Sequence, residues 1–436
     1  MADVPAPAAT ASPSPTPGVR ELLRIPDFRR LYLAQAISDL GDGMTYLALF
    51  LVVLDLTGST AAVALMSILV ALPPVTVGLF AGAYADRHDR RRIMIVSDTV
   101  RAAIVVAMVP VIVAGAIPAL FVLATAQAVI GTFFAPARTA MVPRVVPEEG
   151  LLAANSLGQA TRMIMGVVGA GTTGVIAALA SGEVWPVLVV DAATFIVSVG
   201  LVMRTTRGAG APSAEAAASA RSSGIGSAVL AGLRVIARSR PLVAALAGVA
   251  VTMLGVGAIN VLFIPFLVVD LGASPAWAGP LEAAQTFSMV LAGGLVATLA
   301  SRISVPRLFV GGLIGTAVCV GLLSVAPGPW ALLLIMFGVG WFVMPVQATT
   351  MTLVQRGTDD TTRGRVAGAL NAVVQTASIG SMAAAGILAD VVGMRTVFAA
   401  GAAITLLAAV VAALLFRGVQ EVRPAPAAVP GVPASA

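Results

Sequence analysis

The chain has 436 residues, of which 58% are hydrophobic and 11% are charged, and its formal net charge is +6. A water-soluble protein needs more charged side chains to cover its surface, so this composition excludes an ordinary soluble domain. Apolar runs of about 20 residues recur along the chain, and each is long enough to cross the core of a bilayer. We therefore expect an all-α protein with many membrane spans.

Twelve apolar runs follow one another between two tails that are rich in Pro and Ala. Residues 1–18 lack the basic start and apolar core of a signal peptide, and we expect disordered cytoplasmic tails at 1–18 and 418–436. The predicted spans are 31–54, 60–84, 92–114, 116–139, 155–181, 184–203, 241–269, 276–300, 306–326, 329–354, 366–391 and 395–416.

The connections between these spans differ in charge. One alternate set carries nearly all of the arginines, whereas the other carries acids and a single arginine, Arg395. Basic connections remain in the cytoplasm, so we expect both termini there, in a bacterial inner membrane. The distribution of the arginines over many separate connections argues against nucleic-acid binding, which needs arginines gathered on one face. The acids are Asp55, Glu183, Asp270 and Asp390.

Residues 204–226 are rich in Gly, Ala and Ser and predict a cytoplasmic linker between six-helix halves at 19–203 and 227–417. Both halves carry a Phe-x-x-Pro sequence that is followed by Asn-x-x-x-Gln. Such a repeat is typical of transporters whose substrate site lies between two halves near the bilayer midplane. The repeated segments are 133–136 with 155–159, and 342–345 with 371–375.

The connection between the second and third spans carries the most specific motif, Gly82-Ala83-Tyr84-Ala85-Asp86-Arg87-His88-Asp89-Arg90-Arg91-Arg92. Gly82 permits a close helix approach, and the arginines hold the loop in the cytoplasm. The spacing Gly-x-x-x-Asp-Arg-x-x-Arg-Arg resembles the signature loop of the major facilitator superfamily. The resemblance implies twelve transmembrane helices in two six-helix halves. It also implies that this loop stabilises the outward-facing state, with Asp86 and Arg90 lying against the start of the eleventh span near Arg363 and Arg365. The expected loop residues are Gly82, Asp86, Arg87, Arg90 and Arg91.

Further segments resemble the drug-antiporter branch that includes macrolide-efflux and enterobactin-exporter-like proteins. They are 98–102, 136–138, 191–198 and 363–366. Asp98 and Arg101 lie one turn apart, and we expect them to brace the signature loop. The chain departs from the branch in three places. Gln127 stands where an arginine precedes Gly131, Thr298 stands where an acid would stand, and the fifth span keeps Gly166, Gly169, Gly171 and Gly174 without the Gly-Pro pair.

The first span carries a polar stripe of Gln35, Asp39, Asp42 and Tyr46 on one helix face. Arg162 of the fifth span would lie at a similar depth, and the resemblance places these two spans side by side. We expect Arg162 to pair with Asp39 or Asp42, because a buried arginine without an acid is unstable. Either an acid of this stripe takes up a proton and couples transport to the proton gradient, or the three residues form a fixed cytoplasmic gate.

The predicted substrate cavity mixes amides, aromatic rings and a few acids. Such a cavity suits bulky amphipathic compounds rather than sugars or phosphates. Glu282 either attracts a cation or proton, or is simply hydrated near the periplasmic end. The cavity residues are Gln35, Tyr46, Gln127, Gly131, Phe134, Gln159, Asn260, Glu282, Gln285, Trp341, Gln347, Asn371 and Gln375.

The sequence thus predicts a secondary transporter that exports a small amphipathic drug or metabolite, by proton antiport with alternating access. The alternatives are an uptake permease of the same fold and a transporter-like membrane sensor. We expect a monomer in the lipid bilayer whose partners are the substrate and protons. We expect no enzymatic activity, metal or cofactor, because the only cysteine and the only histidine, Cys319 and His88, form no ligand or catalytic set.

Overall fold

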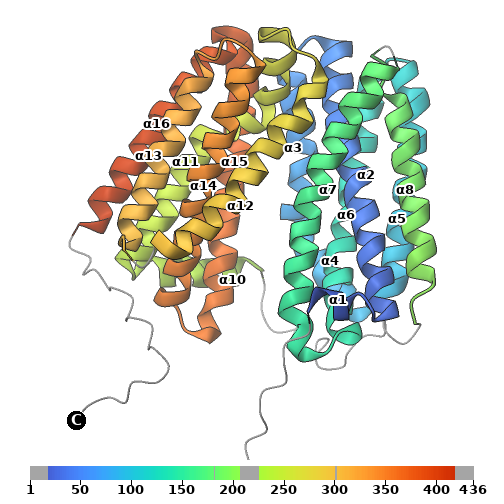
Figure 1. Cartoon of the computed structure of the whole chain (residues 1–436), viewed down its shortest axis with the longest axis horizontal. Helices are drawn as coiled ribbons and strands as arrows, with labels where there is room; N and C mark the ends of the chain where they lie inside the picture. Colours follow the sequence, from blue (N-terminus) through green and yellow to red (C-terminus); the bar gives the residue numbers. More distant parts are fainter. Residues whose placement is uncertain (1–17, 181, 207–224, 300–301, 418–436) are drawn as a thin grey trace, which may run out of the picture.

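The computed structural model describes residues 18–180, 182–206, 225–299 and 302–417, and within them all regular structure is helical (Figure 1). The first half contains α1 (Val19–Leu22), α2 (Pro26–Thr57), α3 (Thr60–Thr76), α4 (Gly78–Arg87), α5 (Arg90–Val113), α6 (Ile117–Val145), η1 (Glu148–Gly150), α7 (Leu151–Leu179) and α8 (Trp185–Met203). The second half contains α10 (Ile225–Ala237), α11 (Arg240–Pro265), η3 (Phe266–Asp270), η4 (Pro275–Trp277), α12 (Ala278–Leu299), α13 (Val305–Leu323), α14 (Pro329–Gly357), α15 (Asp360–Val392) and α16 (Met394–Phe416).

Within the described residues, 10 helices are long and apolar enough to cross a membrane, or 11 if the bent pair α3 and α4 forms one span. The remaining long helix, α12, has 22 residues, so the structure is consistent with the twelve predicted spans. The second span is not the continuous helix that we expected, because it bends by 50° between α3 and α4. Pro73 and Pro74 lie in the last turns of α3, where they remove backbone donors and favour a break.

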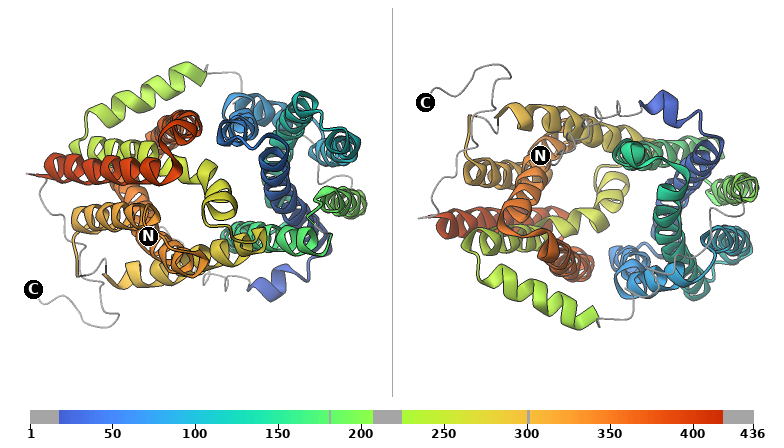
Figure 2. Two further views of the ribbon diagram at one scale, coloured as in Figure 1. Left: turned by 90° about the horizontal axis from the view of Figure 1, so that it is seen from above. Right: turned by 90° about the horizontal axis from the view of Figure 1, so that it is seen from below.

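The helices form two bundles, α2 to α8 on one side and α11 to α16 on the other (Figure 2). This arrangement confirms the predicted fold class. The amphipathic helix α10 lies beside the end of α15, and its Gly232 approaches so closely that an added Cβ would lie 2.2 Å from the Arg365 carbonyl oxygen. The exact limits of the halves stay a prediction. Most of the predicted linker and of the two tails lies outside the described residues.

The two ends of the bundle differ in charge, as the sequence predicts. The arginine-rich end carries α1, α4, α10 and the connections with Arg87, Arg144 and Arg204 (Figure 1). The opposite end, which we call the acidic end, carries Asp55, Glu183, Asp270 and Asp390. Arg395 is the exception at the acidic end, and its guanidinium pairs with Asp270 at 2.8 Å and donates to the Ser324 and Ala326 carbonyls.

The halves meet at the acidic end, in two places. The Thr60 hydroxyl of α3 donates to the Asp390 carboxylate and to the Gly386 carbonyl of α15, the latter at 3.3 Å. On the other side, α7 packs against α12, and a Cβ added to Gly279 would lie 2.4 Å from the Cα of Gly171. Such an approach needs glycine at position 279, because any side chain on Gly279 would separate the two helices.

Close glycine packing also joins α2 to α7. A Cβ added to Gly169 would lie 2.5 Å from the Leu40 carbonyl oxygen, and one added to Gly43 would lie 2.9 Å from that of Gly166. The glycines of the fifth span therefore form a small packing surface, as expected. Gly82 of the signature loop does not, because a Cβ there would meet nothing within 4 Å. The expectation of a close helix approach at Gly82 was wrong.

Candidate functional site

The polar stripe on α2 borders two cavities. The first, which we call the interface cavity, has a volume of about 430 Å³ and is lined by both halves, with Asn260, Glu282 and Gln285 from the second half. The second, the N-half cavity, has a volume of about 500 Å³ and is lined by α2 to α7 alone. Five side chains line both cavities, which therefore share a wall. They are Asp39, Asp42, Tyr46, Phe50 and Arg162.

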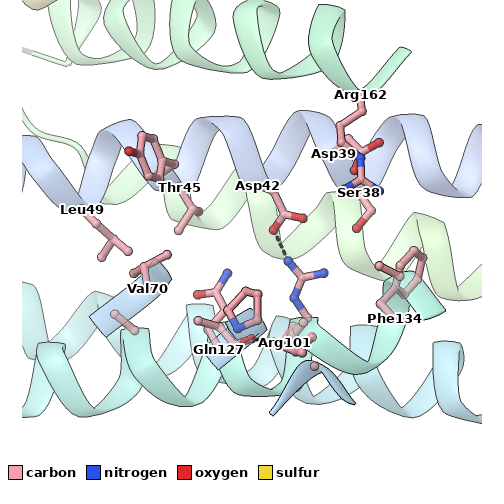
Figure 3. Close-up of a pocket in the computed structure, with 18 of the residues that line it drawn as sticks. Ser38, Asp39, Asp42, Thr45, Leu49, Val70, Arg101, Gln127, Phe134 and Arg162 are labelled. Atoms are coloured by element: carbon pink, nitrogen blue, oxygen red, sulfur yellow. Dashed lines mark hydrogen bonds and ion pairs between the residues drawn. The ribbon is translucent and has the colours of Figure 1, made fainter. Parts of the chain in front are cut away.

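Arg101 of α5 lines the N-half cavity and extends toward Asp42 (Figure 3). Its guanidinium pairs with Asp42 of α2, lies 3.4 Å from Asp98 one turn earlier, and stacks 4.2 Å from the centre of the Phe195 ring of α8. Asp98 in turn accepts a hydrogen bond from Ser198 at 2.6 Å. These contacts connect α2, α5 and α8 through a charged network in which Arg101 and Asp98 are buried and Asp42 is partly exposed to the cavity.

This network corrects one of our expectations and removes one alternative from another. Asp98 and Arg101 do not brace the signature loop, because Arg101 extends toward α2 and contacts Asp42 there. Arg162 does not pair with Asp42, whose partner is Arg101. The spacing along α5 shows that Asp98 and Arg101 share a face, but not that this face is turned toward α2. An arginine within an apolar run was nevertheless a signal of a functional or structural partner.

Asp39 and Arg162 lie beside each other in Figure 3. No ion pair within 4.0 Å joins Arg162 to any described residue, and the Arg162 side chain is exposed to the cavities. One Asp39 oxygen, Oδ2, is buried without a hydrogen-bond partner in the described part of the chain. The expected pair is therefore present as neighbours and not as a direct bond, which leaves the Asp39 carboxylate freer than that of Asp42.

Asp191 of α8 is a further buried acid of the first half. It accepts hydrogen bonds from Thr45 of α2 at 2.5 Å and from Thr194 at 3.1 Å. Gly41 makes room for it, because a Cβ there would lie 2.0 Å from the Asp191 Oδ1 atom. Asp191 is fully buried, so it connects α2 to α8 rather than facing either cavity.

The other predicted cavity residues divide into three groups: those that line one of the two cavities, the buried Gln35, and those that line neither cavity. Gln127, Gly131 and Phe134 line the N-half cavity, and Asn260, Glu282 and Gln285 line the interface cavity. Gln35 is buried instead, where it donates to the Gly158 carbonyl at 3.3 Å and accepts from Arg138. A third group lines neither cavity, and Trp341 in it stacks on Phe337 with ring centres 6.2 Å apart. This group is Gln159, Trp341, Gln347, Asn371 and Gln375.

Glu282 stands apart from the other acids. It lies on α12 one turn after Gly279, beneath the contact between the halves, and it lines the interface cavity. Within the described residues its carboxylate has no hydrogen bond and no ion pair. This position favours a carboxylate that faces the cavity over one that is simply hydrated near the periplasmic end.

The arginines of the signature loop form their hydrogen bonds and ion pairs with residues of the first half. Arg90 lies 3.8 Å from Asp86 and donates to the Ala140 carbonyl at 3.4 Å, and Arg91 donates to the Val202 carbonyl at 3.2 Å and to that of Met203. Among the residues whose side chains are described, none of the second half pairs with the loop. The Arg363 side chain lies outside the described set, so the implied bridge to α15 stays a prediction.

Two helical bundles that meet at one end and border cavities with charged linings are typical of the major facilitator fold of membrane transporters. The chain belongs to the transmembrane secretion effector family of this superfamily, whose model matches residues 21–427. This is a family of membrane transporters rather than of enzymes.

Relatives and solved structures agree with this family. The chain is 28% identical to the multidrug efflux pump Tap of Mycolicibacterium fortuitum, over 89% of this chain and 95% of that protein. It is 29% identical to the uncharacterised transporter YkuC of Bacillus subtilis, and the match spans 42% of each chain. It is also 29% identical to macrolide efflux protein A of Streptococcus pyogenes, over 32% of this chain and 35% of that one. The nucleoside transporter NupG shares the fold with a TM-score of 0.72 at 12% identity, over 89% of this chain and 99% of that one.

Proposed function

We propose that this transporter exports a small amphipathic drug or metabolite in exchange for protons. The observation that carries the proposal is the pair of carboxylates on α2. Asp42 is held by Arg101, whereas Asp39 has an oxygen without a partner, and both face the space between the halves. Asp39 lies beside Arg162 without a direct ion pair, so its carboxylate is freer than that of Asp42 to exchange a proton. Ionisable residues within membrane spans commonly mark proton relays in transporters.

The proposed orientation places the arginine-rich end in the cytoplasm of a bacterial cell, in the inner membrane, with both termini on that side. The halves meet at the acidic end, so the interface cavity would be closed toward the outside in this conformation. An exporter loads its substrate from the cytoplasm in such a state. The names of Tap and macrolide efflux protein A support export over uptake.

The cavities support an amphipathic substrate. Tyr46, Phe50, Phe263 and Met336 supply aromatic and thioether surface, and a few charged groups stand among them. Large apolar compounds gain binding energy from such walls, whereas a sugar needs more polar partners than these cavities offer. A monomer suffices for this site, since one chain supplies both halves.

Transport into everted membrane vesicles, driven by an imposed pH gradient, tests the proposal. Asp39→Asn, Asp42→Asn and the control Asp55→Asn, from the far end of α2, should be compared with the wild type. We expect at least one of the first two to abolish the pH-driven transport and the control to keep it. Full pH-driven transport in both cavity variants would refute proton coupling. Accumulation of compounds inside intact cells would instead identify an uptake permease, and no transport of any compound would favour a sensor.

A further inference from the structure

The N-half cavity contains polar side chains that nothing in the described part of the protein satisfies. Gln127 of α6 is 7% exposed and Ser38 of α2 is 1% exposed, and both line this cavity. Neither side chain has a hydrogen-bond partner among the described residues, and the Gln127 Oε1 and Ser38 Oγ atoms are buried. A buried amide or hydroxyl without a partner is destabilising by about 1–3 kcal/mol. A ligand that forms hydrogen bonds with these two groups would offset this destabilisation, and a functional role is one of the reasons for which such groups occur in proteins.

The arrangement of these groups favours a ligand that both donates and accepts hydrogen bonds. Figure 3 shows Gln127 and Arg101 extending from one side of the cavity toward Asp42 and Ser38 on α2. An amide such as that of Gln127 offers donors and an acceptor, and the Ser38 hydroxyl offers both functions. A ligand group of similar chemistry, such as an amide or an alcohol, would satisfy them together.

The charges of the cavity favour a neutral ligand group. The charged side chains that line it are two acids and two arginines, Asp39, Asp42, Arg101 and Arg162. Arg101 lies against α6, because a Cβ on Gly131, one turn after Gln127, would be 3.4 Å from the Arg101 Nε atom. A cation beside Gln127 would therefore meet Arg101, and an anion would meet Asp42, whereas an uncharged group meets neither penalty.

We propose that the N-half cavity is a second subsite for the transported molecule, and that it takes an uncharged amide- or hydroxyl-bearing group. The apolar remainder of the molecule would occupy the adjoining interface cavity, which the same five side chains of α2 and α7 also line. The volume of about 500 Å³ accommodates a ring-sized group. This inference rests on the proposed export function, but its first test does not need a known substrate.

That test measures access to the cavity by thiol labelling. Gln127→Cys should be treated with neutral 2-hydroxyethyl methanethiosulfonate and with its trimethylammonium-ethyl analogue, each rate being divided by that of a free thiol. We expect the neutral reagent to react at least tenfold faster than the cation. The control Thr125→Cys lies two residues away, where the native hydroxyl bonds the Phe121 carbonyl of its own helix at 2.7 Å, and should show no such preference. An unreactive Gln127→Cys, or one modified equally by both reagents, would overturn the proposal.

The second test uses transport. Gln127→Met keeps the side-chain size and removes the hydrogen-bonding groups, and Thr125→Val is its control. In cells that express each variant, we expect Gln127→Met to lower resistance to chloramphenicol, a neutral amide with hydroxyl groups, at least fourfold and to keep resistance to ethidium. An equal loss for both compounds, or no loss for either, contradicts the subsite. If the wild type protects against neither compound, the failure lies with the proposed multidrug export, and the labelling result still decides the subsite.

Discussion

The contact between Gly171 and Gly279 gives a sharp test of how the two halves close. A Cβ on Gly279 would lie 2.4 Å from the Gly171 Cα, whereas a Cβ on Gly171 would lie at 3.7 Å from the Gly279 Cα, an ordinary contact. The two alanine variants are thus matched in chemistry and adjacent in space, but only Gly279→Ala must separate α7 from α12. The separation needed to reach 3.4 Å is 3.4 − 2.4 = 1.0 Å.

An overpacked contact of this kind is destabilising by about 1–3 kcal/mol. If the strain acts only on the conformation in which the halves meet at the acidic end, it shifts the equilibrium toward the opposite conformation by about 5- to 150-fold. We expect Gly279→Ala to favour the outward-facing state by this factor and Gly171→Ala to leave the equilibrium near that of the wild type.

The assay is labelling of Asn260→Cys, which lines the interface cavity, by a membrane-impermeant thiol reagent added outside right-side-out vesicles. The labelling rate should rise in the Gly279→Ala background and remain unchanged in the Gly171→Ala background. The only native thiol, Cys319, is buried and gives a low background. Equal rates in the two backgrounds would show that the glycine contact does not control closure.

Three further substitutions test the contacts that the structure adds. Thr60→Val removes the hydroxyl that donates to Gly386 and Asp390 across the contact between the halves. It should raise the labelling rate of Asn260→Cys by about two- to tenfold. Thr139→Val is the control and should not change this rate, because the Thr139 hydroxyl bonds a carbonyl of its own helix. Arg101→Gln leaves the buried Asp98 and the partly exposed Asp42 without their cation. Because only Asp98 is fully buried, the substitution should lower the free energy of unfolding by about 3 kcal/mol, seen as a lower unfolding temperature in detergent. Arg92→Gln alters an exposed side chain and should have little effect, and equal unfolding temperatures would show that the network contributes no stability. Gly41→Ala places a Cβ 2.0 Å from the Asp191 Oδ1 atom and should lower the free energy of unfolding by about 1–3 kcal/mol. Gly82→Ala is the control, because a Cβ there has nothing within 4 Å. A Gly82→Ala variant as unstable as Gly41→Ala would refute this packing argument.

The sequence predicted many of the residues that belong to the candidate site, but it did not predict which of them pair with one another. The stripe of Asp39, Asp42 and Tyr46 was visible because helical periodicity fixes which side chains share a face. The partner of Asp42 was not, because Arg101 and Arg162 both lie in apolar runs near the right depth. Only the rotation of α5 and α7 about their axes decides between them, and that rotation depends on side-chain packing with neighbouring helices.

The sequence by itself predicted twelve membrane spans, of which 10 or 11 are found among the described residues, and it predicted the charge difference between the two ends and the family. These features are local or additive, because apolar length and arginine placement act on each segment separately. Only the tertiary structure decided that α3 and α4 bend apart, that Gly82 is uncrowded while Gly279 is not, and that Gln159, Trp341, Gln347, Asn371 and Gln375 lie away from the two cavities. These features depend on distances between helices that are far apart in the chain, and a linear pattern contains no information on such distances.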